Sequence, residues 1–264
     1  MTDPRRNRRW RFLVAPPRNG AENMARDVGL MRRARETGES VFSIYGWAQP
    51  TLSFGRNQTA AGCYDLERMR SLCIDVVRRP TGGRALLHNR EVTYSVTAPV
   101  VPGIALREAY ERINVILLVA LERLGVGASV AGRASQVTTP STLPCFATPS
   151  RGEVIADGRK LVGSAQWRDA GALLQHGSIL IDDDQSLIPT VTLAQNGASV
   201  IPPPATLTRA LGRTPATEEI ADALIDAVRE IQDPHAHELD ELDVRAHTLA
   251  ELPRFENEVW TWRR

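Results

Sequence analysis

The chain has 264 residues, of which 42% are hydrophobic and 24% are charged, so it can bury a sizeable core and does not have the composition of a disordered protein. Its net charge of +1 excludes a strong positive electrostatic field that would attract nucleic acid. No apolar run is long enough for a bilayer span or a signal-peptide core. Cysteines occur only at 63, 73 and 145, an odd and scattered set that predicts neither a disulfide framework nor a metal site. These features predict a soluble protein of the reducing cytoplasm.

Helix and strand patterns alternate along the chain without a repeat or a long linker. Residues 1–12 are expected to form a basic tail, in which five arginines are solvated or contact an acidic partner. Helices are predicted over 19–36, with Asn19 as the cap and Gly38 at the end, and over 65–72, 106–124, 217–231 and a last segment reaching 264. Strands are predicted over 41–47, 51–54, 74–79, 91–98 and 173–181. The interleaving predicts one mixed α/β domain over 1–264.

Lysine occurs once in this chain. Of the 32 basic side chains, 31 are arginine and the remaining one is Lys160. An ammonium can lose its proton when it is desolvated, whereas a guanidinium stays charged. Lys160 follows Asp157-Gly158, a dipeptide typical of hairpin turns, between two short apolar runs. A Ser-, Thr- and Pro-rich loop over 135–150 precedes this hairpin and contains Cys145. A lysine retained by chance and a buried structural cysteine remain alternatives on these patterns alone.

Motif searches exclude several kinds of enzyme. The chain has no phosphate-binding GxxxxGK[ST] loop, no HExxH, no GxSxG and no CxxC. His235 and His237 have no further ligand at a suitable spacing, so they are expected to be exposed polar residues of a turn. No metal site is predicted.

Residues 78–88, Arg-Arg-Pro-Thr-Gly-Gly-Arg-Ala-Leu-Leu-His, resemble the signature of the biotin/lipoate protein ligase and transferase family. Three further segments resemble that family in the same order: residues 23–25 with 45–55, residues 158–166 and residues 175–180. The resemblance implies a mixed central sheet flanked by helices, related to class II aminoacyl-tRNA synthetases, with a catalytic core over about 38–240.

Within the family, the chain is similar to the LipM-type octanoyltransferases. Cys145-Phe146-Ala147 stands fifteen residues before Lys160, Arg84 replaces a third glycine, and Gln175-His176 replaces a double histidine of ATP-dependent ligases. This resemblance implies that Cys145 is an acyl-carrying nucleophile and that Lys160 favours its thiolate and then acts as a base. It implies no ATP and no other cofactor.

The same resemblance implies substrate-binding roles for a group of residues around the diglycine loop and the lysine strand. They are Arg79, Gly82, Gly83, Arg84, His88, Gly163, Ser164, Ala165, Gln166 and His176. The structural alternatives are a simple turn for the glycines, a strand cap for Arg79 and satisfied core positions for the histidines. Cys63 and Cys73 are expected to be structural.

The predicted reaction is octanoyl transfer from acyl carrier protein to a lipoyl-type domain, for which the glycine cleavage H protein is the expected acceptor. A monomer without nucleic-acid or membrane partners is expected, and the basic N-terminus and Arg84 are candidate contacts for acidic partner proteins. Three other functions stay open: an ATP-dependent lipoate ligase, an amidotransferase between lipoyl domains and a noncatalytic acyl-protein binding module.

Overall fold

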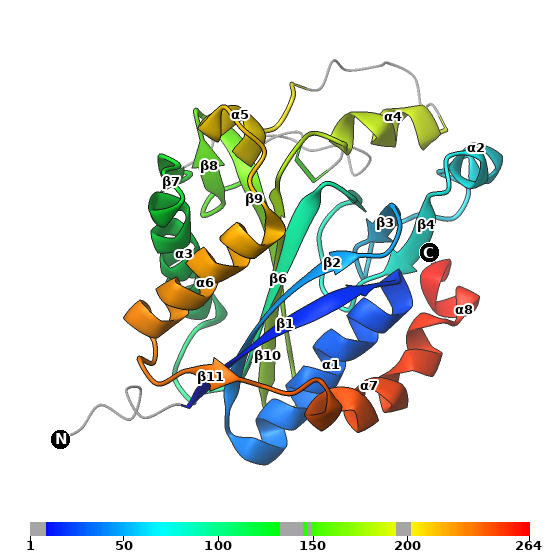
Figure 1. The fold of residues 1–264 in the computed structure, drawn as a ribbon. Helices are drawn as coiled ribbons and strands as arrows, with labels where there is room; N and C mark the ends of the chain where they lie inside the picture. The colour runs from blue at the N-terminus through cyan, green and yellow to red at the C-terminus, as the bar shows by residue number, and fades with distance from the viewer. Residues whose placement is uncertain (1–8, 133–144, 147–148, 194–201) are drawn as a thin grey trace.

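The computed structural model describes residues 9–132, 145–146, 149–193 and 202–264, which form two sheets flanked by helices (Figure 1). The large sheet contains, in spatial order, β11 (His237–Glu238), β1 (Trp10–Arg18), β2 (Ser40–Trp47), β6 (Glu91–Pro99), β10 (Ala172–Leu180), β9 (Arg159–Asp169), β8 (Val154–Ala156) and β7 (Ala128–Val130). The small sheet contains β4 (Asp75–Arg78), β3 (Thr51–Phe54) and β5 (Leu86–His88). The helices are α1 (Gly20–Thr37), α2 (Leu66–Ser71), α3 (Leu106–Arg123), α4 (Ile188–Val191), α5 (Leu207–Leu211), α6 (Thr217–Ile231), α7 (Leu242–Phe255) and α8 (Glu258–Thr261), with a 3₁₀ turn at Gln185–Leu187.

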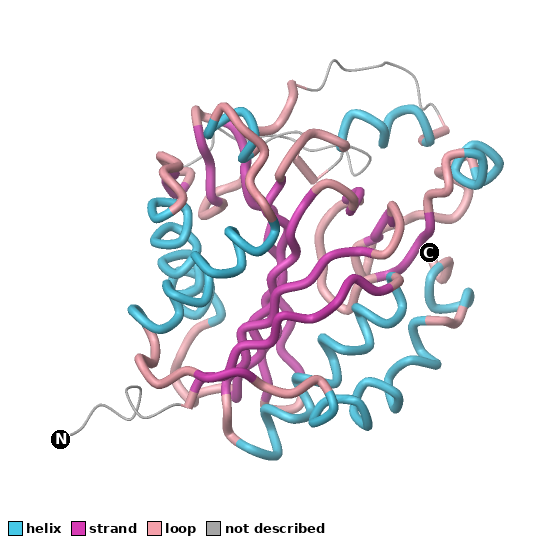
Figure 2. The backbone as a smooth tube through the Cα atoms, viewed as in Figure 1, coloured by secondary structure: helices cyan, strands magenta, loops and turns pink. Residues whose placement is uncertain are grey.

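The large sheet is mixed, as the sequence predicts. Its first strand, β1, pairs in parallel with both β11 and β2, and the pairs from β2 through β6, β10, β9 and β8 to β7 are antiparallel. The strands of this sheet run together through the middle of the molecule (Figure 2). In the small sheet, β3 pairs in parallel with β4 and antiparallel with β5.

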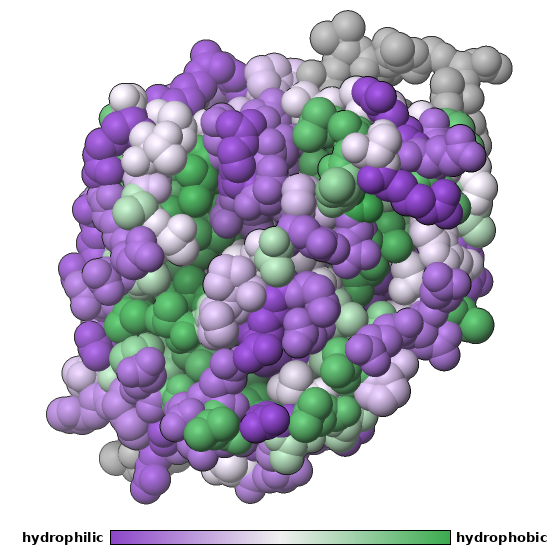
Figure 3. Space-filling view, turned by 45° about the vertical axis from the view of Figure 1, so that its right-hand side comes forward, coloured by the Kyte–Doolittle hydropathy of each residue, from purple (hydrophilic) through white to green (hydrophobic). Residues whose placement is uncertain are grey.

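Helices cover both faces of the large sheet. On one face, apolar residues of β2, β6 and β10 pack with those of α3 and α6 in the largest core cluster. On the other face, α1 packs against the sheet, and α7 lies along α1 (Figure 1). Outside these layers the surface is largely hydrophilic, with hydrophobic patches between the polar side chains (Figure 3). No helix that the structure describes is long and apolar enough to cross a bilayer.

Local signals in the sequence place several elements correctly. The Asn19 side chain accepts a hydrogen bond from the Glu22 backbone in a capping box, and α1 ends at Gly38 in the left-handed conformation (φ 73°). Asp157-Gly158 forms the predicted turn between β8 and β9. The helix predicted over 217–231 has the same bounds as α6.

Two terminal predictions are wrong in detail. The tail predicted over 1–12 includes Trp10, Arg11 and Phe12, which lie in β1, where Trp10 and Phe12 are buried in the core. Residues 1–8 lie outside the described residues. The last segment is two helices, α7 and α8, and α8 ends at Thr261 instead of Arg264. In both segments, arginines interrupt the pattern of apolar residues from which a strand or helix is predicted.

We expect Asn19→Ala to lower the free energy of unfolding by about 1 kcal/mol, because the N-cap oxygen satisfies a backbone N–H that would otherwise lack a partner. Asn19→Gly should cost only a few tenths of a kcal/mol, since glycine is also tolerated at this position. Urea unfolding of the two variants and the wild type measures the difference. Equal losses in both variants would show that the capping hydrogen bond does not stabilise α1.

Candidate active site

Cys145 and Lys160 meet at the start of β9. Lys160 is the second residue of β9 and only 2% exposed. Its Nζ atom donates to the Cys145 carbonyl at 3.0 Å and to the Cys145 Sγ at 3.2 Å. The Cys145 backbone N–H in turn donates to the Ala85 carbonyl at 2.9 Å. The structure therefore brings together the thiol and the amine that the sequence singles out, and ties the cysteine to the loop that follows the diglycine.

A third residue of this group, Glu153, is absent from the sequence-based prediction. Its Oε1 atom accepts from Lys160 Nζ at 2.6 Å, and its Oε2 atom accepts from the Ser150 backbone at 2.7 Å. The carboxylate is nearly as buried as the lysine, with side-chain exposures of 11% and 1%. An ammonium has three N–H donors, and here Glu153 and the two Cys145 atoms accept from all three.

The Cys145 sulfur faces a cavity of about 150 Å³. Most of the predicted site residues line this cavity: Arg79, Gly83, Arg84, His88, Cys145, Lys160, Gly163, Ser164, Ala165 and His176. Met24, Leu86, Thr93, Ser150, Glu153, Gly177 and Ser178 complete the wall. Gly82 and Gln166 are not among the lining residues. The Gly82 carbonyl accepts from Arg79 at 3.1 Å, and the Gln166 amide lies 2.8 Å from that of Gln175.

The lysine strand needs a glycine where it passes Cys145. A Cβ atom on Gly163 would lie 3.0 Å from the Phe146 ring and 3.2 Å from Lys160 Cε. Phe146 packs with Leu86 and Leu180 next to Cys145, and Lys160 Nζ lies 5.0 Å from the centre of its ring. A larger residue at 163 would therefore push Phe146 or the lysine away from the sulfur.

Arg79 holds the diglycine loop from inside the protein. Its Nη1 atom donates to the Ser53 carbonyl at 2.8 Å, and its Nη2 atom donates to the carbonyls of Gly82 and Arg84 at 3.1 and 3.0 Å. Burial lowers the pKa of Arg79, and the nearby Cys145 acts in the opposite direction. Arg79 therefore has a structural role in the loop and also places a second cation near the sulfur.

Arg84 differs from Arg79 in one respect that matters for ligands. Its Nη1 atom is buried, yet it has no hydrogen-bond partner within the described part of the chain. A buried polar group without a partner costs free energy, and Arg84 lines the cavity. This N–H group is therefore available to a substrate oxygen.

His88 lies in a hydrogen-bonded network in the cavity wall. Its Nε2 lies 2.7 Å from Ser53 Oγ and its Nδ1 lies 3.1 Å from Glu91 Oε1. The ring stacks on Trp47 with 3.9 Å between the centroids. Burial lowers the pKa of His88, although Glu91 counteracts this effect.

His176 lies in a second network of the same wall. Its Nδ1 lies 2.8 Å from Asp27 Oδ2 and its Nε2 lies 2.7 Å from Thr81 Oγ1. Asp27 Oδ2 also accepts from the Tyr45 hydroxyl at 3.0 Å. Both histidines thus border the cavity while their ring nitrogens are satisfied by the protein, which supports their structural alternative as strongly as a direct site role.

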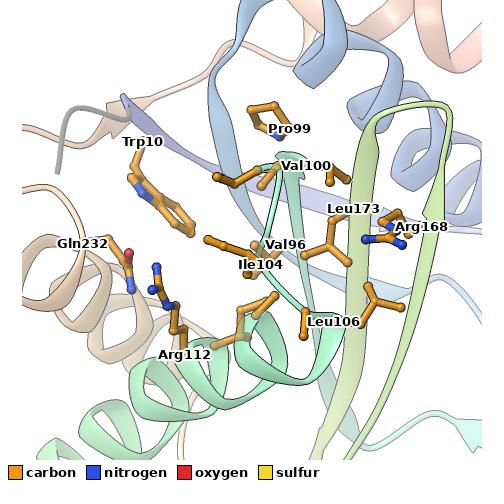
Figure 4. Close-up of a pocket in the computed structure, with 15 residues that line it drawn as sticks. Trp10, Val96, Pro99, Val100, Ile104, Leu106, Arg112, Arg168, Leu173 and Gln232 are labelled. Atoms are coloured by element: carbon orange, nitrogen blue, oxygen red, sulfur yellow. The ribbon is translucent and has the colours of Figure 1, made fainter. Parts of the chain in front are cut away.

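A second cavity, of about 90 Å³, lies at the opposite ends of β6 and β10 (Figure 4). Its wall is mainly apolar, and its only charged members are Arg112 and Arg168. Arg112 already donates to Glu108 at 2.7 Å. Because this wall contains no thiol, amine, carboxylate or imidazole, the reactive groups point to the Cys145 cavity as the active site. The described residues contain no group of three or more side chains that could hold a metal ion.

Residues 19–229 match the model of the lipoyl protein ligase A/B catalytic domain. This match covers well over half of the chain, so the chain belongs to this family. The family predicted from the sequence is confirmed.

Curated relatives identify a narrower group. The chain is 45% identical over 186 residues to a protein named octanoyltransferase LipM from Kyrpidia tusciae, which covers 66% of this chain and 67% of that protein. It is 38% identical over 228 residues to the octanoyltransferase LipM of Symbiobacterium thermophilum, which covers 81% of this chain and 83% of the relative. These relatives confirm the prediction of an acyltransferase.

Solved structures confirm the fold. A putative lipoate protein ligase from Thermoplasma acidophilum, Ta0514, superposes with a TM-score of 0.79 at 21% identity, covering 97% of this chain and all of that one. A lipoate-protein ligase A bound with ATP gives a TM-score of 0.77 at 20% identity, covering 96% and 98%. At these identities the comparison establishes the architecture, and the reaction has to be inferred from the site residues.

We expect Glu153→Gln to lower the free energy of unfolding by about 3 kcal/mol, because it removes the carboxylate from a buried ammonium. The matched control is the double variant Glu153→Gln with Lys160→Met, in which neither residue is charged and much of the lost stability should return. Urea unfolding at pH 7 compares the three proteins. If Glu153→Gln unfolds at the wild-type urea concentration, Lys160 does not depend on Glu153 for its charge.

Proposed function

We propose that this protein transfers an octanoyl group from an acyl carrier protein, through a thioester on Cys145, to a lysine of a lipoyl-type domain such as the glycine cleavage H protein. The transfer is a step in forming the lipoyl cofactor on its carrier domain. The observation that carries the proposal is the 3.2 Å contact between the Cys145 sulfur and the chain's one lysine, in the wall of a cavity. The names of the curated relatives support the octanoyl group.

In the first half-reaction the Cys145 thiolate attacks the thioester carbonyl of the donor. The Lys160 ammonium and the Arg79 guanidinium stabilise the negative charge on the sulfur before attack. The new bond joins Sγ to the acyl carbon, and the bond to the donor sulfur breaks. The departing donor thiolate takes a proton from Lys160, so the products are the acyl-enzyme, a neutral lysine and the free carrier thiol.

In the second half-reaction a lysine amine of the acceptor attacks the acyl-enzyme. Its nitrogen bonds to the acyl carbon, and the bond to Cys145 Sγ breaks. Lys160, now neutral, accepts the proton that the attacking nitrogen loses. The products are the amide and the original ammonium–thiolate pair, so no external energy source is consumed.

Glu153 and Arg84 have supporting roles in this scheme. Glu153 would hold the Lys160 ammonium in place beside the sulfur, because its Oε1 atom accepts from Nζ at 2.6 Å. The unpartnered Arg84 Nη1 is a suitable donor to an acyl or carrier oxygen in the cavity. We assign Gly163, Ser164 and Ala165 to the wall that contacts the acyl chain, because all three line the same cavity as Cys145.

We expect incubation with octanoyl-acyl carrier protein in nucleotide-free buffer to yield an octanoylated protein. The adduct should be removed by hydroxylamine, because a thioester reacts with it, and it should be absent from Cys145→Ala. Intact mass spectrometry measures it. The matched control is Cys63→Ala with Cys73→Ala, which should be acylated like the wild type.

Other results of this experiment identify other functions. Acylation in Cys145→Ala would show that the nucleophile assignment is wrong. A strict requirement for free octanoate, ATP and magnesium would make the protein a ligase. Transfer only from an octanoylated lipoyl domain would make it an amidotransferase, and no transfer from any donor would leave a binding module.

We expect Lys160→Arg to form the acyl-enzyme about tenfold more slowly, equivalent to about 1.4 kcal/mol of transition-state stabilisation, because the cation next to the sulfur is retained. Transfer to the acceptor should slow by about 10²- to 10⁴-fold, since a guanidinium cannot accept the proton of the attacking amine. Single-turnover mass spectrometry of the two half-reactions measures both rates.

The control for this variant is Lys160→Ala, which lacks the cation and should form little acyl-enzyme. An acyl-enzyme that accumulates and then stalls in Lys160→Arg supports a role for Lys160 in both half-reactions. Equal and mild slowing of both half-reactions would show that Lys160 serves only in packing.

A further inference from the structure

Two tryptophans and three arginines form a stacked group on the side of the molecule where α7, α8 and β9 meet. The Arg254 and Arg263 guanidiniums each lie 3.9 Å from the centre of the Trp260 ring. The Arg56 and Arg254 guanidiniums lie 5.2 and 5.8 Å from the centre of the Trp167 ring. We call these five residues the arginine–tryptophan surface. Cations stacked on aromatic faces in this way are held in place.

The three arginines of this surface lack acidic partners. No ion pair within the described ranges includes any of them, and Glu251, one helical turn before Arg254, pairs with Arg32 instead. Burial lowers the pKa of Arg254; the nearby Glu251 carboxylate raises it, Arg56 and Arg263 lower it, and Asp169 has a smaller raising effect. Three guanidiniums whose charges repel one another attract an anion from outside the chain.

The arginine–tryptophan surface adjoins the active-site cavity. Trp167 lies two residues beyond Ala165 on β9, so the two side chains point to the same face of the sheet. Trp167 and Trp260 pack against the cluster that contains Met24, which also lines the cavity. The Arg56 backbone N–H donates to the Thr81 carbonyl at 2.7 Å, directly before the diglycine loop.

A buried arginine, Arg78, fixes this surface to the core. Its guanidinium donates to the Gly55 and Gln58 carbonyls, both at 2.7 Å, and to the Thr261 carbonyl at 2.8 Å. The Trp260 indole donates to the Arg78 carbonyl at 2.9 Å. The loop that carries Arg56 and the segment that carries Arg263 are therefore held by the same side chain, and the surface is preformed.

We propose that the arginine–tryptophan surface binds the acidic acyl carrier protein that donates the octanoyl group, at its phosphopantetheine arm and the adjoining acidic surface. The proposal rests on the proposed function, because the donor is defined there. Trp167 lies four residues from Gly163, about 13 Å along β9 at the usual rise of a strand. A phosphopantetheine arm is long enough to span a distance of this order, whereas the lysine side chain of an acceptor domain is too short. Guanidiniums also bind the phosphodiester of that arm with paired hydrogen bonds.

The test compares two octanoyl donors. The variant is Arg254→Gln with Arg263→Gln, and the measured quantity is kcat/KM for acylation of Cys145. With octanoyl-acyl carrier protein we expect kcat/KM to fall about tenfold, mainly through KM, and to lose much of its dependence on salt. With octanoyl-pantetheine, which lacks both the phosphate and the carrier, kcat/KM should be unchanged.

Two control variants separate charge from structure. Arg254→Lys with Arg263→Lys retains the charges and should preserve most of the activity with the carrier. Arg70→Gln with Arg245→Gln removes two exposed arginines that have no ion pair in the described ranges, and should react like the wild type with both donors.

The possible outcomes separate a failure of the proposed surface from a failure of the proposed reaction. An equal loss of kcat/KM with both donors, or no loss with octanoyl-acyl carrier protein, would show that the arginine–tryptophan surface does not bind the carrier. Neither result would contradict the proposed reaction. If neither donor acylates the wild type, the proposed function fails, and direct binding of the unacylated holo-carrier protein by calorimetry still tests the surface. Binding that is weaker in Arg254→Gln with Arg263→Gln, but unchanged in Arg70→Gln with Arg245→Gln, would support the surface. Equal binding by both variants would contradict it.

Discussion

The site depends on one buried ammonium. Lys160 could not remain charged at 2% exposure without acceptors, because an unpaired buried charge is too costly. Glu153 supplies the countercharge, and the other two N–H groups go to the carbonyl and the sulfur of Cys145. The Lys160 ammonium thus holds both the backbone and the sulfur of Cys145 in position, and in the proposed reaction the same cation would activate the thiol.

The residues around that ammonium lie partly on strands and partly in loops. Lys160 and the small residues that follow it lie on β9, which is paired on both sides by β8 and β10. Cys145 lies outside the regular elements and is positioned by one hydrogen bond to Ala85 and two from Lys160. Arg79 fixes the diglycine loop opposite. In the proposed reaction the loop residue would carry the acyl group, while its cation is held on a strand that keeps the same pairing throughout.

The sequence predicts the elements with strong local signals and the parts of the site that a family resemblance covers. The Asn19 cap, Gly38 and the Asp157-Gly158 turn each specify local backbone geometry. Glu153 could not be found in this way, because a single carboxylate before a strand has no spacing that distinguishes it from a solvated one. Similarly, β1 contains arginines and two prolines, and it becomes a strand only through its parallel pairing with β2 and β11. A local sequence pattern carries no information about strand pairing between distant segments.

A lipoate-protein ligase A bound with ATP has the same fold, and a shared fold does not by itself determine the reaction. A nucleotide requires cations that are free to contact phosphate oxygens. Both terminal nitrogens of Arg79 already donate to the loop and to Ser53, and the Lys160 ammonium is shared by Glu153 and Cys145. Recruiting Lys160 to a nucleotide would break its contacts with Cys145, and recruiting Arg79 would break its contacts with the diglycine loop. These contacts support our proposal that the acyl group arrives already activated as a thioester, and they leave the unpartnered Arg84 Nη1 available to an oxygen of that substrate.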